Sequence, residues 1–230
     1  MNKISIIIPV LNEAEYIGRL ISHVQLNSEQ SNIAEIIVVD GGSHDDTVKI
    51  ASEFSGIKIL KTDRGRAIQM NSGAEQATGD ILYFLHADSF PPENFDKKII
   101  ARISKSKPAG CFQLKFDDDH WWLRLAGWFT QFNWRICRGG DQSLFISRSL
   151  FKDIGKFNTS YLIYEDNDLI QKLYDRRAFT VIKSPIISSA RCYRKNGVWR
   201  LQFHFWAIYL KKWLGASADD IYHYYKRNII

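Results

Sequence analysis

Four short apolar runs in the first 90 residues constrain the fold of this chain more than any other feature. They are Ile4–Val10, Ile33–Asp40, Ile57–Lys61 and residues 80–86. The first two lack polar alternation, which is typical of strands buried on both faces. The intervals between the runs are long enough for helices, which we predict at residues 13–26, 45–54 and 65–77. Strands joined by helical crossovers predict an α/β fold with a mostly parallel, Rossmann-like sheet flanked by helices.

The second half of the chain has a less regular pattern, and its elements follow from shorter signals. We predict strands at 110–116 and 142–147 and helices at 121–136, 165–176 and 198–214, with a last short helix after Ser217. No repeat or linker divides the chain. We therefore expect one catalytic domain over residues 1–195 and a C-terminal helical appendage over residues 196–230.

Charge and cysteine content narrow the class of protein. The formal net charge of +6 favours anionic partners such as nucleotide phosphates or acidic lipid headgroups. Nucleic acid is not an expected partner, because no zinc-finger or RNP-like pattern accompanies the charge. Three scattered cysteines suggest neither a disulfide framework nor a zinc site. Since no apolar run approaches the roughly 20 residues that span a bilayer, we expect a cytoplasmic protein.

Acidic residues follow two of the predicted strands, at the edge where α/β sheets collect ligands. Asp40 precedes Gly41, which lets a ligand approach closely, so its carboxylate either binds a ligand or caps the next helix. Asp88 lies just past the fourth strand, where an oxygen ligand suits Mg²⁺ or Mn²⁺, and His86 beside it would favour Mn²⁺. The alternative is a solvated turn aspartate beside a core histidine.

Two further groups of charged residues open predicted helices. Glu165 and Asp166 either complement a helix dipole or include a general base. Arg64 and Arg66 flank a glycine at a helix start, an arrangement that favours an anion site. No G-x-G-x-x-G or P-loop motif is present in the sequence, which argues against a dinucleotide-binding or P-loop enzyme.

In order along the chain, five segments resemble the motifs of the family 2 glycosyltransferases. They are IIIPVLNE, IIVVDGGSHDDT, GRAIQMNSGAEQATGDILYFLHADS, GDQSLFISRSLFKDIGKF and YEDNDL. The resemblance covers about residues 3–195, and LHADS together with GDQSLF resembles a small, soluble bacterial subgroup. It implies a GT-A-like fold and transfer of a sugar from a nucleotide-sugar, with UDP as the expected nucleotide, to a hydroxyl acceptor with inversion.

The resemblance also implies roles for individual residues. Asp166 matches the catalytic base and Glu165 its neighbour, while Asp88, with His86, would hold Mn²⁺ or Mg²⁺. The acceptor loop would contain Gly140, Asp141 and Gln142. The nucleotide site would contain Pro9, Val10, Asn12, Glu13, Asp40, Gly41, Arg64, Arg66 and Ala87.

The sequence departs from the family pattern at two places. His86-Ala87-Asp88 stands where the family usually has Asp-x-Asp, which puts the strength and preference of the metal site in doubt. The Gln-x-x-Arg-Trp motif of processive polysaccharide synthases is missing, so we do not expect a polymer synthase. Arg191 or Arg194 would then contact the diphosphate.

Aromatic residues in the C-terminal part leave several interpretations open. Trp199 to Trp213 form a helical stripe beside basic residues, which suits contact with the inner face of a membrane through residues 197–214 and a lipid-linked acceptor. The alternatives are docking onto the catalytic domain or a homodimer. Trp121 and Trp122 either shape an acceptor pocket or belong to the core.

Two other functions fit parts of the sequence. A nucleotidyltransferase would need a glycine-rich basic loop, which IPVLNE is not. A non-catalytic carbohydrate- or membrane-binding protein on the same fold would not need Asp40, Asp88 and Asp166 together.

Overall fold

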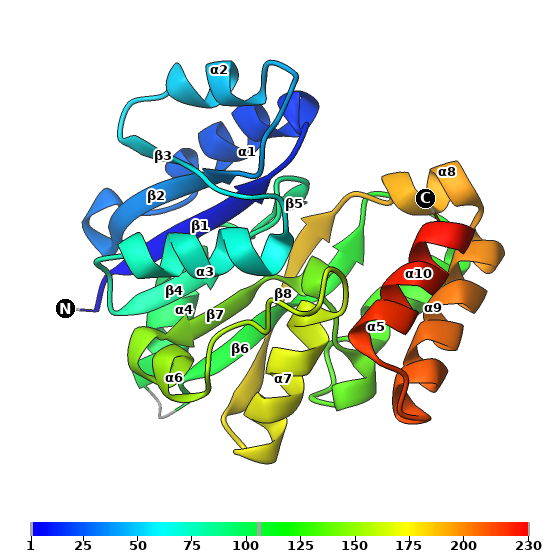
Figure 1. Ribbon diagram of the computed structural model, residues 1–230. Coiled ribbons are helices and arrows are strands. Elements are labelled where there is room, and N and C mark those ends of the chain that lie inside the picture. The colour runs from blue at the N-terminus through cyan, green and yellow to red at the C-terminus, as the bar shows by residue number, and fades with distance from the viewer. Residues whose placement is uncertain (1, 105–106, 230) are drawn as a thin grey trace.

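A computed structural model describes residues 2–104 and 107–229 and contains one mixed eight-stranded sheet of order β3-β2-β1-β4-β7-β6-β8-β5. Figure 1 shows this sheet with helices on both faces. The strands are β1 (Ile4–Val10), β2 (Ile33–Asp40), β3 (Ile57–Lys61), β4 (Ile81–Phe84), β5 (Ser89–Phe90), β6 (Ala109–Phe116), β7 (Leu144–Ser147) and β8 (Phe179–Ser188). The predicted α/β fold is confirmed.

Parallel pairing is confined to two parts of the sheet. Strands β3, β2, β1 and β4 are mutually parallel, and β6 is parallel to β8. The β7 strand runs antiparallel to both β4 and β6, and β5 runs antiparallel to β8. The carboxyl ends of β1 and β2 therefore lie at one edge with the segment that follows β4, as the sequence pattern predicts.

Helices cover both faces of the sheet and extend beyond it. They are α1 (Ala14–Leu26), α2 (Thr47–Ser52), α3 (Arg66–Gln76), α4 (Phe95–Ser104), α5 (Trp121–Phe129), α6 (Arg148–Asp153), α7 (Glu165–Asp175), α8 (Arg191–Asn196), α9 (Val198–Trp213) and α10 (Ala218–Asn228). Short 3₁₀ turns lie at Gln30–Asn32 (η1), Arg135–Cys137 (η2) and Gly140–Gln142 (η3).

Two predicted element boundaries are wrong, and one strand was missed. The strand predicted over 80–86 ends at Phe84, before His86. The helix predicted over 121–136 ends at Phe129, because the Thr130 hydroxyl donates to Gly127 O and accepts the Leu114 amide, which ties the chain to β6. The β8 strand was not predicted, since Pro185 interrupts its apolar pattern where the register with β6 shifts.

Two hydrophobic cores lie on opposite faces of the sheet, and β1 contributes to both. Ile4, Ile6 and Ile8 pack into the core beneath α1, while Ile7 packs into the core beneath α3. This explains why β1 shows no polar alternation. A Cβ atom at Gly73 would lie 2.5 Å from Ile7 Cγ2, so glycine lets α3 approach β1 closely.

The C-terminal helices pack against the rest of the chain through a small third core. Leu201, Ile208 and Ile221 are buried there against Ile163 and Tyr164, which precede α7. In Figure 1, helices α8, α9 and α10 lie at the end of the molecule away from β3 and α2. Within residues 2–104 and 107–229, no helix combines the length and apolar character needed to cross a bilayer.

Candidate active site

The loops that follow β1 and β2 are joined by hydrogen bonds. The Asn12 amide donates to Ser43 Oγ, and Asn12 Oδ1 accepts the His44 amide. The Glu13 amide donates to Thr47 Oγ1 at the start of α2. Asn12 has a φ of 55°, a left-handed conformation that asparagine tolerates better than most residues. These contacts fix the two loops that the sequence assigns to the nucleotide.

Beneath these loops lies a buried glutamine that sequence reasoning missed. Gln69 Nε2 donates to Val10 O and Val39 O, both at 2.8 Å, and so joins the ends of β1 and β2. A Cβ atom at Gly41 would lie 3.0 Å from the Gln69 side chain. Asp40 is buried, and its Oδ1 accepts the Ser43 amide. One oxygen of Asp40 thus holds the loop, but Asp40 does not cap the next helix, because the N-cap residue of α2 is Asp46.

A single guanidinium joins the β1 loop to the segment that follows β4. Arg191 Nε lies 3.1 Å from Asp88 Oδ2. Its two terminal nitrogens donate to the two Glu13 carboxylate oxygens at 2.6 and 2.7 Å. The guanidinium also stacks over the Tyr16 ring, 4.9 Å from the ring centroid. Asp88 and Glu13, which are 75 positions apart in the sequence, therefore converge on one cation.

Asp88 and Glu13 are the candidate ligands for a divalent metal, because both lie around one cation. Burial raises the pKa of Asp88 to about 6, and the charges of Asp141 and Glu13 add to that rise, while Arg191 opposes it. Two carboxylates around one positive group are the oxygen donors that Mg²⁺ and Mn²⁺ prefer. The described residues contain no group of three or more His, Cys, Asp and Glu placed to hold a metal. Asp88 and Glu13 thus fit a metal that takes its other ligands from a bound phosphate or water.

The second cluster lies at the start of α7. Arg66 Nη1 lies 3.1 Å from Glu165 Oε1 and 3.9 Å from Asp166 Oδ2. His86 Nε2 approaches Asp166 Oδ2 to 4.0 Å from the other side. Glu165 is fully buried, and neither carboxylate oxygen has a hydrogen-bond partner among the described residues, so its ion pair with Arg66 compensates the charge.

The pKa values of Asp166 and His86 are shifted in opposite directions. Burial, followed by the neighbouring charge of Glu165, raises the pKa of Asp166, while Arg66 lowers it. Burial, together with the charges of Arg66 and Arg191, lowers the pKa of His86 to about 3, so the imidazole is neutral near pH 7. A carboxylate with a raised pKa beside a neutral histidine suits proton transfer.

His86 and Asp88, which the sequence pairs at one metal, face different clusters in the structure. Because β4 ends at Phe84, residues 86–88 lie in a turn and lose the shared direction that a strand would give them. Ala87 between them is buried. His86 faces Asp166, and Asp88 faces Arg191.

The remaining candidate residues are distributed around the two clusters. Asp141 in η3 is exposed, and its charge raises the pKa of both Asp88 and Asp166, which places it near both. Its neighbour Gln142 is buried and accepts from Arg138 while donating to Cys137 O. Gly140 begins η3, and Pro9 and Val10 end β1. Arg64 is exposed and precedes α3. Arg194 pairs with Asp117 and Asp118.

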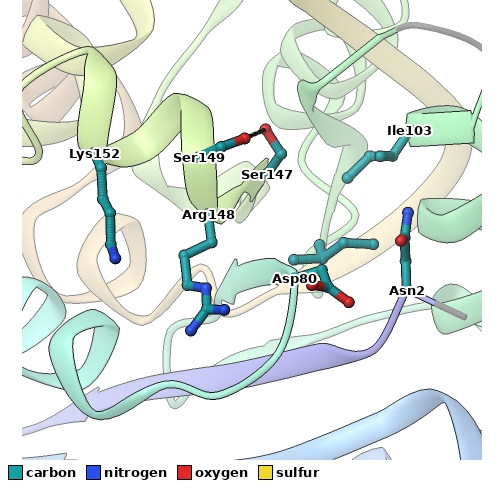
Figure 2. Close-up of a pocket in the computed structure, with 8 residues that line it drawn as sticks. Asn2, Asp80, Ile103, Ser147, Arg148, Ser149 and Lys152 are labelled. Carbon is teal, nitrogen blue, oxygen red and sulfur yellow. Dashed lines mark hydrogen bonds between the residues drawn. The ribbon is translucent and has the colours of Figure 1, made fainter.

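A pocket of about 450 Å³ lies away from these clusters, where β4 begins and β7 ends (Figure 2). Asp80, Ser147, Arg148 and Lys152 line it, and Arg148 donates to Ala77 O. None of the candidate site residues lines this pocket. The candidate site is therefore the sheet edge that carries Asp88 and Asp166.

Comparison with known proteins shows the family to which this chain belongs. The model of the family described as "Glycosyl transferase family 2" matches residues 5–164. The chain belongs to glycosyl transferase family 2. The match includes β1 to β7, both loops around Asp40 and Asp88, and the segment up to Tyr164 that immediately precedes Glu165.

Curated relatives share parts of the chain. "Glycosyltransferase AglE" of Haloferax volcanii is 37% identical over 44% of this chain and 35% of its own length. A "PGL/p-HBAD biosynthesis glycosyltransferase" of Mycobacterium bovis is 31% identical over 71% of this chain and 66% of its own. An "Undecaprenyl-phosphate 4-deoxy-4-formamido-L-arabinose transferase" of Proteus mirabilis is 28% identical over 55% and 41%. The chain thus spans between one third and two thirds of the length of these relatives.

Solved structures share the GT-A fold at low sequence identity. TarS of S. aureus in complex with UDP matches with a TM-score of 0.67 at 18% identity. The match covers 82% of this chain and 60% of the TarS chain. Mannosyltransferase PcManGT of Pyrobaculum calidifontis, in complex with GDP-Man and Mn²⁺, has a TM-score of 0.68 at 18% identity and covers 96% and 67%.

Proposed function

We propose that this protein is an inverting, metal-dependent glycosyltransferase that moves a sugar from a nucleotide-sugar, with UDP as the first candidate nucleotide, to a hydroxyl acceptor. The observation that carries this proposal is the position of two carboxylates with different partners at one sheet edge. Asp88 is held with Glu13 around a cation, and Asp166 is buried beside neutral His86. Family membership and the two fold neighbours with bound nucleotides support the same interpretation.

In this mechanism the two clusters divide the work. Asp166 removes the proton of the acceptor hydroxyl as that oxygen attacks the anomeric carbon, and a single displacement inverts the configuration. The charge of Arg66 limits the rise in the pKa of Asp166 that burial causes, and so favours the ionised form that a base needs. Asp88 and Glu13 would hold a divalent metal, which would neutralise charge on the diphosphate leaving group. Arg191 supplies a second cation for the same diphosphate.

We infer a lipid-linked acceptor as the finer assignment. The name of the Proteus mirabilis relative gives undecaprenyl phosphate as its lipid. The exposed stripe from Trp199 to Trp213 supports contact with a membrane through residues 197–214, as the sequence pattern predicts. A nucleotidyltransferase and a non-catalytic binding protein have less support, because neither explains the Asp166 cluster.

The test is a screen of UDP- and GDP-sugars with Mn²⁺ or Mg²⁺, read out by calorimetric binding and by release of nucleoside diphosphate. We expect at least one UDP-sugar to bind in a metal-dependent way and to release UDP slowly by hydrolysis without acceptor. Chelation should abolish the release and restoring the metal should recover it. If no sugar nucleotide binds under either metal, the enzymatic proposal fails.

A further inference from the structure

Helix α5 turns its more apolar face toward solvent. Trp121, Leu125, Trp128 and Phe129 recur at helical spacing and are exposed, with Trp121 60% and Trp128 50% accessible. The buried side of the helix offers only Leu123 and Gly127. A surface helix of a globular protein normally shows the reverse arrangement, with its apolar stripe on the core.

Helix α9 repeats this inverted arrangement over four turns. Of its 16 residues only Leu201 and Ile208 are buried. Two of its polar side chains contact neighbouring helices instead, since Gln202 Oε1 accepts from Trp122 Nε1 and His204 Nδ1 is hydrogen-bonded to Tyr224 Oη. The exposed residues that form one apolar stripe are Trp199, Phe203, Trp206, Leu210 and Trp213.

Ring contacts join the two helices into one surface, which we call the aromatic face. It consists of Trp121, Leu125, Trp128 and Phe129 of α5 and Trp199, Phe203, Trp206, Leu210 and Trp213 of α9. Trp199 lies 5.7 Å from Trp121 and 5.3 Å from Trp122, and Trp122 lies 5.9 Å from Trp206, measured between ring centroids. So large an exposed apolar patch marks an interaction site rather than an ordinary surface.

The charges within the two helices favour an anionic partner. Helices α5 and α9 contain no acidic residue, and of the three aspartates that precede α5, Asp117 and Asp118 pair with Arg194. Arg124 and Arg200, within these helices, are exposed and form no ion pair with any acidic residue in the described part of the chain. A second copy of the same face would bring like charges together, whereas anionic lipid headgroups would neutralise them.

We propose that the aromatic face, formed jointly by α5 and α9, docks this protein onto an anionic bilayer surface, with the tryptophan rings at the headgroup level. The tail stripe predicted from sequence is only half of this surface. Aromatic rings with adjacent basic side chains are the residues that hold peripheral helices at a membrane interface.

Helix α9 also reaches the acceptor side of the candidate active site. Tyr209 Oη, on α9, lies within hydrogen-bond distance of Arg138 O, at 3.2 Å, and of Asn167 Oδ1, at 3.3 Å. Asn167 directly follows Asp166 in α7. Docking would thus bring the proposed base near the lipid surface from which a lipid-carried acceptor comes. This last consequence rests on the proposed function, but the docking does not.

The experiment is flotation of the full chain with phosphatidylcholine vesicles, with and without phosphatidylglycerol, in the absence of any substrate. We compare the wild type with Leu125→Gln/Trp128→Gln on α5 and Phe203→Gln/Leu210→Gln on α9. We expect each double variant to bind anionic vesicles about tenfold more weakly, because each loses two large apolar anchors. Leu26→Gln is the matched control, since Leu26 is 84% exposed on α1, away from this face.

Two further measurements make the result decisive. Brominated lipids should quench wild-type tryptophan fluorescence, and Trp128→Gln should retain less of this quenching. Thermal unfolding shows whether each variant folds. Substitutions are used in place of truncation at residue 197, because truncation would remove Leu201 and Ile208 from a buried core. The proposal is overturned if folded wild type ignores both vesicle types, if only α9 matters, or if the substitutions instead dissociate a dimer in sedimentation.

Discussion

Strand β1 and helix α9 are both rich in apolar residues, but they use them in opposite ways. Six of the seven β1 residues are buried, and its isoleucines supply both cores of the sheet. Helix α9 buries two of its 16 residues and presents the rest of its apolar stripe to solvent. The nucleotide end of the molecule is thus a completed core, while the C-terminal end presents an apolar surface that needs a partner.

The two candidate clusters draw on both of these regions. In the Asp88 cluster, Glu13 follows the end of β1 that Gln69 holds, whereas Arg191 begins α8. The Asp166 cluster is built on α7, whose first turn contacts the C-terminal helices through Asn167. The two clusters are also linked electrostatically, because Asp141 raises the pKa of both carboxylates and Arg191 lowers that of His86.

The largest difference between an effect on transfer and an effect on nucleotide binding is expected for Asp166→Asn. Removing the proposed base should lower the rate of transfer about 100- to 10,000-fold, while nucleotide affinity in calorimetry stays near the wild-type value. Asp168→Asn is the matched control, because Asp168 lies in the same helical turn but pairs with Lys172. Full transfer activity in Asp166→Asn, or an equal loss in Asp168→Asn, would contradict the assignment.

The next effect concerns stability at the nucleotide end. Gln69→Leu removes two buried hydrogen bonds and leaves carbonyl groups at the ends of β1 and β2 without this donor. We expect a loss of about 2 kcal/mol in the free energy of unfolding, measured by urea denaturation. Gln76→Leu, at the exposed end of the same helix, should change stability little. Equal effects of the two substitutions would show that the bridge contributes nothing.

The sequence predicted the completed core far better than the surface that needs a partner. The bounds of β1, β2 and β3 were predicted to the residue. For β1 and β2 the reason is that strands buried on both faces leave an uninterrupted apolar signal. The helix over 121–136 was predicted too long, since aromatic spacing does not reveal the Thr130 contacts that end it. Periodicity also cannot tell which face of α5 or α9 is buried.

Residue types at the site were readable, but their pairing was not. Asp88 and Arg191 were both candidates, yet their contact depends on where α8 lies relative to β4, about 100 positions earlier in the chain. His86 was expected beside Asp88 and faces Asp166 instead, because the strand ends two residues early. Gln69 gave no signal, since a lone glutamine in a helix carries no motif.

A smaller effect is expected from Arg191→Gln, which tests the shared cation position. Without nucleotide, the guanidinium competes with a metal for Asp88 and Glu13, so its removal should tighten Mn²⁺ binding about five- to tenfold in calorimetry. Arg194→Gln is the control, because Arg194 lies on the same helix but pairs with Asp117. Unchanged Mn²⁺ affinity in Arg191→Gln would mean that the metal binds elsewhere.

The smallest effect is a displacement of the pH profile, and it distinguishes the two carboxylates. A general base works when ionised, so kcat/KM should rise with pH through the pKa of the group responsible. Arg66 is the cation that lowers the pKa of Asp166, whereas Arg191 is the cation that lowers the pKa of Asp88. Arg66→Gln should therefore move the rising limb to higher pH, while Arg66→Lys, which keeps the charge, should move it less. If Arg191→Gln moves the limb and Arg66→Gln does not, the titrating group is Asp88, and Asp166 is not the base that limits the rate. In the wild type, burial and two arginines hold the pKa of His86 near 3, below the raised pKa of either carboxylate, so the limb is assigned to a carboxylate.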